Sequence, residues 1–313
     1  GEGLVPEMEK RGYKKSMSLG PILGSGGLAI MIPPSDLAIL LGAVGRISIG
    51  RILMAIIIPG VLLAVLYATY VIIRCWLQPS IAPSYEVPHV SLSEKLSVGA
   101  RYILPIGVIV FLVIGVVFLG IATPTEAAAT GALGTFILAA FYRKLNWKVA
   151  KKSINGTVQL AVMMLMIIVG ATAFSQILAF SGASQGLVNV ASNLPVDPIL
   201  IIVGMQILVI FLGMFMEQVS IIMITLPLFM PIILSMGFSP VWFAVIFLLN
   251  MEMATTTPPF GLSLFVMKAV APPNTTMGDI YKAALPFLGV ALIVMGLIIA
   301  FPAIALWLPS VMR

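Results

Sequence analysis

Long hydrophobic runs, separated by short polar segments, extend along almost the whole chain. A helix of about 20 apolar residues is long enough to cross the ~30 Å hydrocarbon core of a bilayer. By this criterion we predict five full spans, at residues 50–77, 101–119, 126–142, 156–180 and 284–308. The pattern therefore predicts an all-α integral membrane protein that crosses the bilayer several times.

One apolar region, residues 14–45, contains a segment that does not suit a continuous span. Residues 24–36 read GSGGLAIMIPPSD. Glycine lowers helix stability, and proline removes a backbone donor and clashes with the preceding turn. Freed backbone groups at membrane depth are tolerated only where protein buries them or where they line a cavity. We therefore predict a broken helix over residues 14–45, unwound within 24–36.

The helix breakers of this region recur 225 residues later with the same spacing. The first set is Pro6, Gly12, Tyr13, Pro33 and Pro34, and the second is Pro231, Gly237, Phe238, Pro258 and Pro259. The repeat predicts a second broken helix over residues 239–271, unwound within 250–261 (NMEMATTTPPFG). Paired interrupted hydrophobic segments in corresponding halves indicate the binding site of a transporter.

Two apolar arms, residues 198–213 and 220–235, precede the second broken helix and flank the sequence MFMEQVS. Each arm could be a full span or one limb of a re-entrant hairpin. The apolar tip around Glu217 favours a re-entrant hairpin, because a turn in bulk water need not be apolar. By the repeat, residues 1–12 match the end of such a hairpin, so we expect residue 1 to open within a longer protein.

The remaining segments connect these elements. We predict interfacial helices at residues 91–101 and 181–196, and helix caps at Thr123 or Thr125 with Glu126 and at Asp197. Three parts follow: residues 1–77 as an incomplete first repeat, 78–196 as a cytoplasmic loop with scaffold helices and an interfacial helix, and 197–313 as a second repeat.

The basic residues test this topology. If the cluster at residues 143–152 is cytoplasmic, 14 of the 17 lysines and arginines fall on the cytoplasmic side. Only Arg46, Arg51 and Arg313 fall outside. This asymmetry agrees with the positive-inside rule, and it gives the two broken helices opposite orientations in the membrane. We interpret the 143–152 cluster as a topology anchor rather than as a site for anionic lipid.

Composition narrows the function. The chain is 60% hydrophobic and 9% charged, whereas soluble domains carry about 25% charged residues. The net charge of +6 is no sign of nucleic-acid binding, because the basic residues gather at span ends. The single cysteine, Cys75, excludes an internal disulfide, and the single histidine, His89, lies in a polar loop. With no catalytic histidine arrangement and no phosphate-binding loop, we predict that the protein is not an enzyme.

The two breaks supply the candidate ligands. Helix N-termini suit anions, whereas helix C-termini, unwound carbonyls and hydroxyls suit Na+ as a hard cation. We assign substrate binding to Ser35, Asp36, Thr256 and Pro258. The Na+ candidates are Gly24, Ser25, Gly27, Glu217, Ala254, Thr255 and Thr257. No organic cofactor is expected.

Three carboxylates lie within these membrane segments. An ionisable side chain at membrane depth is costly and is functional by default. We interpret Glu217, at the hairpin tip, as a coupling or gating residue. For Glu252 and Asp36 a functional role and a purely structural one, as a helix cap or hydrogen-bond partner, stay open.

Four motifs in order resemble the large membrane subunit of TRAP transporters, the DctM-like permeases. They are residues 4–13 (LVPEMEKRGY), 24–35, 120–127 (GIATPTEA) and 257–262 (TPPFGL), and the likeness covers essentially the whole chain. The resemblance implies an inverted-repeat, elevator-type secondary transporter of the ion transporter superfamily, driven by a Na+ gradient. It also implies cation sites at the hairpin tips and broken helices. Two features depart from the family pattern: the first hairpin tip is absent, and Glu217 stands where many relatives have Asp.

The resemblance also implies partners and a location. A small four-helix membrane subunit, DctQ-like, and a periplasmic substrate-binding protein, DctP-like, are expected in a bacterial or archaeal inner membrane. The substrate would be a small organic acid, a C4-dicarboxylate or a 2-oxo or hydroxy carboxylate; residues 265–273 (FVMKAVAPP) resemble the branch named for mannitol, chloroaromatic compounds and 2-oxo acids. The alternative is a proton-coupled organic-anion exporter or a channel without a binding protein. A non-transporting scaffold is disfavoured, because it has no use for buried, interrupted helices.

Overall fold

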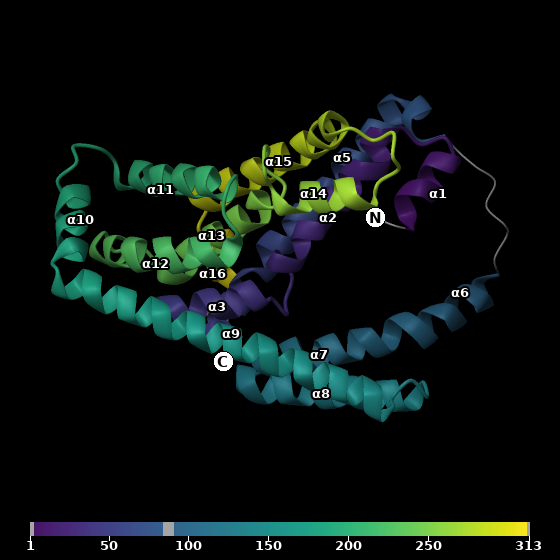
Figure 1. Ribbon diagram of the computed structural model, residues 1–313, viewed down its shortest axis with the longest axis horizontal. Helices are drawn as coiled ribbons and strands as arrows, with labels where there is room; N and C mark the ends of the chain where they lie inside the picture. Colours follow the sequence, from purple (N-terminus) through teal and green to yellow (C-terminus); the bar gives the residue numbers. More distant parts are fainter. Residues whose placement is uncertain (1–2, 84–90, 312–313) are drawn as a thin grey trace. The chain divides into compact units, whose positions relative to one another are not determined.

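The computed structural model describes residues 3–83 and 91–311, and every regular element in these ranges is a helix (Figure 1). His89 and Arg313 lie outside the described residues. The chain divides into two compact units: the first is Gly1–Tyr85 with Ala171–Ser310, and the second is Glu86–Gly170 with Val311–Arg313. The predicted repeats, residues 1–77 and 197–313, thus fall almost wholly in the first unit.

The first unit contains most of the helices. In the N-terminal part they are α1 (Leu4–Lys10), α2 (Lys15–Met31), α3 (Asp36–Gly45), α4 (Ile49–Ala55), α5 (Ile57–Leu77) and the short η1 (Pro79–Ile81). In the C-terminal part they are α10 (Ala183–Ser192), α11 (Pro198–Gly213), α12 (Gln218–Ser235), α13 (Pro240–Ala254), α14 (Leu262–Val270), α15 (Met277–Ala300) and α16 (Ala303–Ser310).

The second unit holds α6 (Leu92–Val98), the π-helical η2 (Gly99–Ile103), α7 (Leu104–Phe118), α8 (Pro124–Phe141) and most of α9 (Trp147–Phe180). Helices α7 and α8 lie side by side (Figure 1). The predicted cap of α8 is confirmed: Thr123 and Glu126 form a reciprocal capping box. Asp197 likewise caps α11, by accepting a hydrogen bond from the backbone N–H of Ile199.

Five stretches of described helix are long and apolar enough to cross a membrane, and a bent helix pair adds a sixth candidate. The five are Ile49–Leu77, Leu92–Phe118, Trp147–Phe180, Gln218–Ser235 and Met277–Ala300. The bent pair is α2 with α3, at 43°. The predicted span at 126–142 is helical as α8, but this helix is not among the stretches that are long and apolar enough.

Two predicted boundaries were wrong. The interfacial helix expected at 91–101 does not end before the next span: α6, η2 and α7 form one continuous helix, in which the π-helical turn of η2 precedes Pro105. The last span, expected over 284–308, ends at Ala300, and α16 follows as a separate helix. Pro302 explains this break, because it offers no N–H and disfavours helical backbone at Phe301.

The unwound segments are also shorter than predicted. Helix α2 continues to Met31, so the first break is residues 32–35, and α13 continues to Ala254, so the second is residues 255–261. Gly24 and Gly27 remain helical and serve close packing instead. A Cβ on Gly24 would overlap the Phe287 ring, and one on Gly27 would lie 2.5 Å from Glu252 Oε1. The glycines therefore let neighbouring helices approach.

Helix boundaries recur at the spacing of the helix breakers. Helices α1 and α12 end at Lys10 and Ser235, α2 and α13 begin at Lys15 and Pro240, and α3 and α14 end at Gly45 and Val270. Gly12 and Gly237 occupy corresponding turns, with φ angles of 84° and 75°. Both need glycine because an L side chain is strained at positive φ.

Helices α2 and α13 form the centre of the first unit and pack against each other. Helix α2 also packs on α5 and α15, and a core of Leu19, Leu23, Leu264 and Ile280 joins it to α14 and α15. Along α13 every residue from Val241 to Ala254 is buried. Helix α13 is therefore buried on all sides rather than along one stripe, as expected for a helix at the centre of a unit. Several of the candidate site residues lie on this helix or contact it.

Candidate functional site

The first break is short and its polar groups are largely used to start α3. Ser35 is buried, and its Oγ accepts a hydrogen bond from Ala38 N at 3.3 Å. Asp36 is exposed, and its Oδ1 accepts from Leu37 N at 2.9 Å. The Pro33–Pro34 peptide bond is cis, as is Pro258–Pro259 in the second break. Two of the predicted substrate residues therefore lie at the N-terminus of α3.

The second break follows the C-terminus of α13 and carries three threonines. The Thr255 hydroxyl donates to Glu252 O at 3.0 Å, and those of Thr256 and Thr257 donate to Met253 O at 3.1 and 2.7 Å. Thr256 and Thr257 are buried. Helix α14 starts after Gly261 with no side-chain cap, and Ser263 N donates to Thr255 O at 2.9 Å.

The tip of the α11–α12 hairpin contacts the second broken helix. A Cβ on Gly213, the last residue of α11, would lie 2.5 Å from Ala254 Cβ, so the two helix ends touch. From the start of α12, Gln218 Nε2 donates to Met251 O at 2.7 Å. The Phe215 and Phe260 rings lie 5.8 Å apart. Glu217 itself is exposed and caps α12, accepting from Val219 N and Ser220 N.

A buried carboxylate joins the second broken helix to the first half of the chain. Glu252 is 1% exposed, and its Oε1 accepts a hydrogen bond from the Tyr67 hydroxyl at 3.0 Å. Its Oε2 is buried and has no hydrogen-bond partner among the described residues. Gly27 of α2 lies directly against the carboxylate. Helices α2, α5 and α13 thus meet at one polar point inside an apolar unit.

Two residues earlier on α13, Asn250 forms a second polar pair that ties the hairpin to the same helix. Asn250 Nδ2 donates to both the backbone O and the Oε1 of Gln206, each at 2.9 Å. Both residues are buried. These bonds join α11 to α13, whereas Gln206 Nε2 and Asn250 Oδ1 are buried without a hydrogen-bond partner among the described residues.

The structure brings together part of the predicted site. Gly27, Ala254 and the threonines of the second break lie around one end of α13, and the tip that holds Glu217 lies beside it. Ser25 is exposed, and its hydroxyl donates within α2, to Ile22 O at 3.4 Å. Tyr67 was not anticipated. A tyrosine hydroxyl inside an apolar span was the available signal, but the same span also contains Tyr70, and the partner of Tyr67 lies 185 positions away.

The first unit also contains a cavity of about 790 Å³ between the α3–α4 turn, the C-terminal end of α9, α12 and the start of α13. Arg46 and Arg51 line it, together with Ser175, Gln176 and Ser239. Among these lining residues are none of the predicted substrate residues, which lie at the breaks. Arg46 and Arg51, which are both predicted to lie outside the cytoplasm, therefore line the same cavity.

Comparison with known proteins identifies the family. Residues 1–304 match the family model described as "Tripartite ATP-independent periplasmic transporter, DctM component". The chain belongs to this DctM family. It is therefore a permease component of a transporter and not an enzyme, and a tripartite system implies further components.

Several curated DctM relatives extend over nearly the whole chain. It is 31% identical to the C4-dicarboxylate TRAP transporter large permease protein DctM of Pseudomonas aeruginosa, over 98% of this chain and 70% of that protein. It is also 31% identical to the ectoine permease TeaC of Halomonas elongata, over 98% and 71%. The isethionate permease DctMQ of Oleidesulfovibrio alaskensis is 30% identical over 97% of this chain and 47% of that protein. The family is thus shared by proteins named for different substrates.

Proposed function

We propose that this DctM-family chain carries a small organic acid inward across a bacterial inner membrane, driven by co-transport of Na+. A periplasmic binding protein would deliver the acid, and a small four-helix membrane subunit would complete the complex. The observation that supports this proposal best is the convergence at α13. The hairpin tip, the second break and Glu252, which touches α2, all lie at the C-terminal end of this one helix.

The helix ends at the two breaks suit the two kinds of cargo. Helices α2 and α13 end at the breaks, and their C-terminal carbonyls carry partial negative charge that suits Na+. Helices α3 and α14 begin there and present N–H groups, which suit a carboxylate. Helix α14 has no side-chain cap, although the N–H groups of Ser263 and Leu264 already donate, to Thr255 O and Gly261 O.

The repeated helix boundaries support an alternating-access cycle. Parts related by the 225-residue spacing have opposite predicted orientations, as the basic residues indicate, and inverted repeats can exchange roles between inward- and outward-facing states. We propose that the two breaks and the α11–α12 hairpin move together as an elevator. The tight joining of α2, α5 and α13 at Glu252 suits a unit that moves as one body.

We base the proposed substrate class on an anionic group that is common to the substrates in the relatives' names. C4-dicarboxylate, ectoine and isethionate each carry a carboxylate or sulfonate, which a helix N-terminus can bind. For this chain we propose a C4-dicarboxylate or a 2-oxo or hydroxy carboxylate. Ser35, Asp36, Thr256 and Pro258 stay its predicted contacts.

Uptake by proteoliposomes tests the proposal. They would contain the permease and its small subunit, and radiolabelled succinate or 2-oxoglutarate would be supplied with or without binding protein. We expect saturable uptake that requires an inward Na+ gradient and added binding protein. Uptake driven equally by a proton gradient without Na+, or independent of binding protein, would contradict the proposal and favour the exporter or channel.

Matched variants test the predicted sites in the same assay. We expect Glu217→Gln and Thr256→Ala to lower uptake at fixed Na+ without loss of expression. Glu126→Gln is the control for the first, because the Glu126 carboxylate also accepts a backbone N–H at a helix start, from Thr123 N at the start of α8. Thr130→Ala is the control for the second, because its hydroxyl also donates within its own helix, to Ala127 O. Unchanged Na+ dependence in both site variants would remove these residues from the site.

A further inference from the structure

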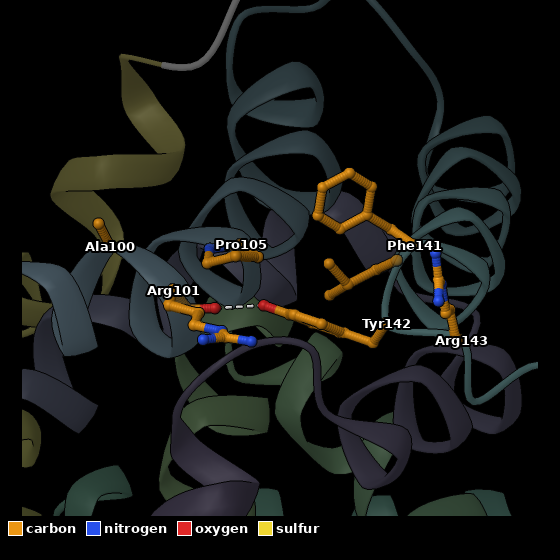
Figure 2. A pocket seen from close by; sticks show the side chains of 7 residues that line it. Ala100, Arg101, Pro105, Phe141, Tyr142 and Arg143 are labelled. Atoms are coloured by element: carbon orange, nitrogen blue, oxygen red, sulfur yellow. Dashed lines mark hydrogen bonds between the residues drawn. The ribbon is translucent and has the colours of Figure 1, made fainter.

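A small cavity with two arginines lies at one end of the α7–α8 pair in the second unit (Figure 2). Its volume is about 400 Å³. The lining residues are Ala100, Arg101, Pro105, Leu138, Phe141, Tyr142 and Arg143. None of them belongs to the breaks or the hairpin, so the transport site described above does not account for this cavity.

The backbone holds both arginines in place. The Tyr142 hydroxyl donates a hydrogen bond to Arg101 O, which ties the end of α8 to η2. Arg143 follows in the left-handed conformation, with φ of 55°, and its N–H donates to Ala140 O at 2.9 Å. In Figure 2 the two arginine side chains stand on either side of Tyr142. A turn and a cross-helix bond therefore fix the backbone of both arginines at the cavity.

Neither arginine is neutralised within the described part of the chain. No carboxylate there lies within ion-pair distance of Arg101 or Arg143. The Arg101 guanidinium lies 5.8 Å from the centre of the Tyr102 ring, an arrangement that keeps its charge. A site with two unpaired guanidinium groups favours an anion, and guanidinium matches phosphate oxygens in two-point contacts.

The rest of the lining is apolar and faces outward. Phe141 is 82% exposed, and Pro105 and Leu138 complete the wall. On α7, next to the cavity, Leu104 and Ile106 are also exposed. Cationic groups at the end of an apolar, outward-facing helix are typical of the membrane interface. An occupant must therefore be anionic at one end and apolar at the other.

We propose that this cavity binds one anionic phospholipid, with the phosphate of its head group on Arg101 and Arg143 and an acyl chain along Phe141 and Leu138. The positive-inside distribution puts both arginines on the cytoplasmic side, where anionic head groups attract basic pockets between membrane helices. For Arg143 this replaces the interpretation of the 143–152 cluster as a topology anchor rather than a lipid site, and it is the cavity that leads to the change. It does not rest on the proposed transport function.

Native mass spectrometry of the purified permease tests the proposal. The protein would be titrated with phosphatidylglycerol, phosphatidylcholine or inorganic phosphate. We expect one tightly bound phosphatidylglycerol and weak binding of the other two. Removing both charges by Arg101→Gln with Arg143→Gln should weaken phosphatidylglycerol binding about thirty-fold, because each cation near the surface contributes about fivefold in affinity.

Matched variants separate a built site from general charge. Lys148→Gln with Lys151→Gln removes the same charge from the same cytoplasmic cluster outside the cavity, and should change binding less than about threefold. Phe141→Ala, at an exposed position that cannot disturb the core, should weaken phosphatidylglycerol binding about tenfold by removing the apolar wall. Equal affinity for phosphatidylcholine, equal loss in the lysine control, or phosphate binding as tight as lipid binding would overturn the proposal.

Discussion

Two helical stretches of nearly equal hydrophobicity have opposite surroundings in this protein. In Ile49–Leu77, which comprises α4 and α5, half of the most apolar window is buried; in Leu92–Phe118, which comprises α6, η2 and α7, the share is 6%. The first stretch packs on α2, α15 and α16, whereas the second has α8 as its neighbour over α7. Hydropathy therefore identifies a membrane helix without showing whether its side chains face protein.

Glycines and polar side chains also have different surroundings in the two units. In the first unit glycines admit a ring or a carboxylate, and a tyrosine and a glutamate pair inside the protein. In the second unit Gly131 likewise packs against Val113, but Gly99 and Gly107 have open space where a Cβ would be, and the arginines face a surface cavity. Substitutions of the same kind should therefore act differently at the packed positions of the first unit and at the open positions of the second.

The largest expected difference concerns a phenylalanine pair. Phe247 of α13 is 0% exposed and lies 5.9 Å from the Phe243 ring, whereas Phe111 of α7 is 61% exposed. We expect Phe247→Ala to cost about 3–5 kcal/mol of stability by leaving a cavity. Phe111→Ala should cost less than about 1 kcal/mol, because neighbouring groups or lipid can fill the space. Thermal unfolding in detergent, followed by size-exclusion chromatography, measures both; equal shifts would erase the contrast.

A glycine pair should give the next effect. Gly27→Ala places a methyl group 2.5 Å from Glu252 Oε1, whereas Gly107→Ala meets nothing within 4 Å. We expect Gly27→Ala to cost about 1–3 kcal/mol through overpacking and to slow uptake. Gly107→Ala should leave both unchanged or slightly improve stability, since alanine favours helix. The same unfolding assay, with succinate uptake beside it, compares the two; a tolerated Gly27→Ala would show that α2 can move away from α13.

The smallest effect concerns a single hydroxyl. Tyr67→Phe removes the hydrogen bond to Glu252, and the net cost should be about 1 kcal/mol. Tyr102→Phe, at an exposed position of the second unit, is the control and should be neutral. A double-mutant cycle with Glu252→Gln isolates the pair, because only interacting residues give non-additive changes. Additive changes would show that the contact contributes nothing to holding α5 on α13.

The hairpin shows where sequence reasoning reached its limit. Its two arms, α11 and α12, match the predicted arms within two residues, because Asp197 and Glu217 cap them locally. That the tip contacts α13 through Gln218 and Gly213 could not be predicted, since an amide and a glycine carry no sign of their partners. Whether the hairpin is re-entrant stays a prediction.

The sequence by itself determined most of the helical segments, the recurrence of helix breakers and the family. These depend on caps, prolines and glycines that act within about one helical turn, so residues close together in the sequence are enough to predict them. Only the tertiary structure decided that α2 stays wound through Gly24 and Gly27 and that Glu252 meets Tyr67. Both outcomes rest on partners distant in the sequence, Phe287 and Glu252 for the glycines and Tyr67 for the carboxylate. Packing with such partners outweighs the weak local preference of glycine to leave a helix.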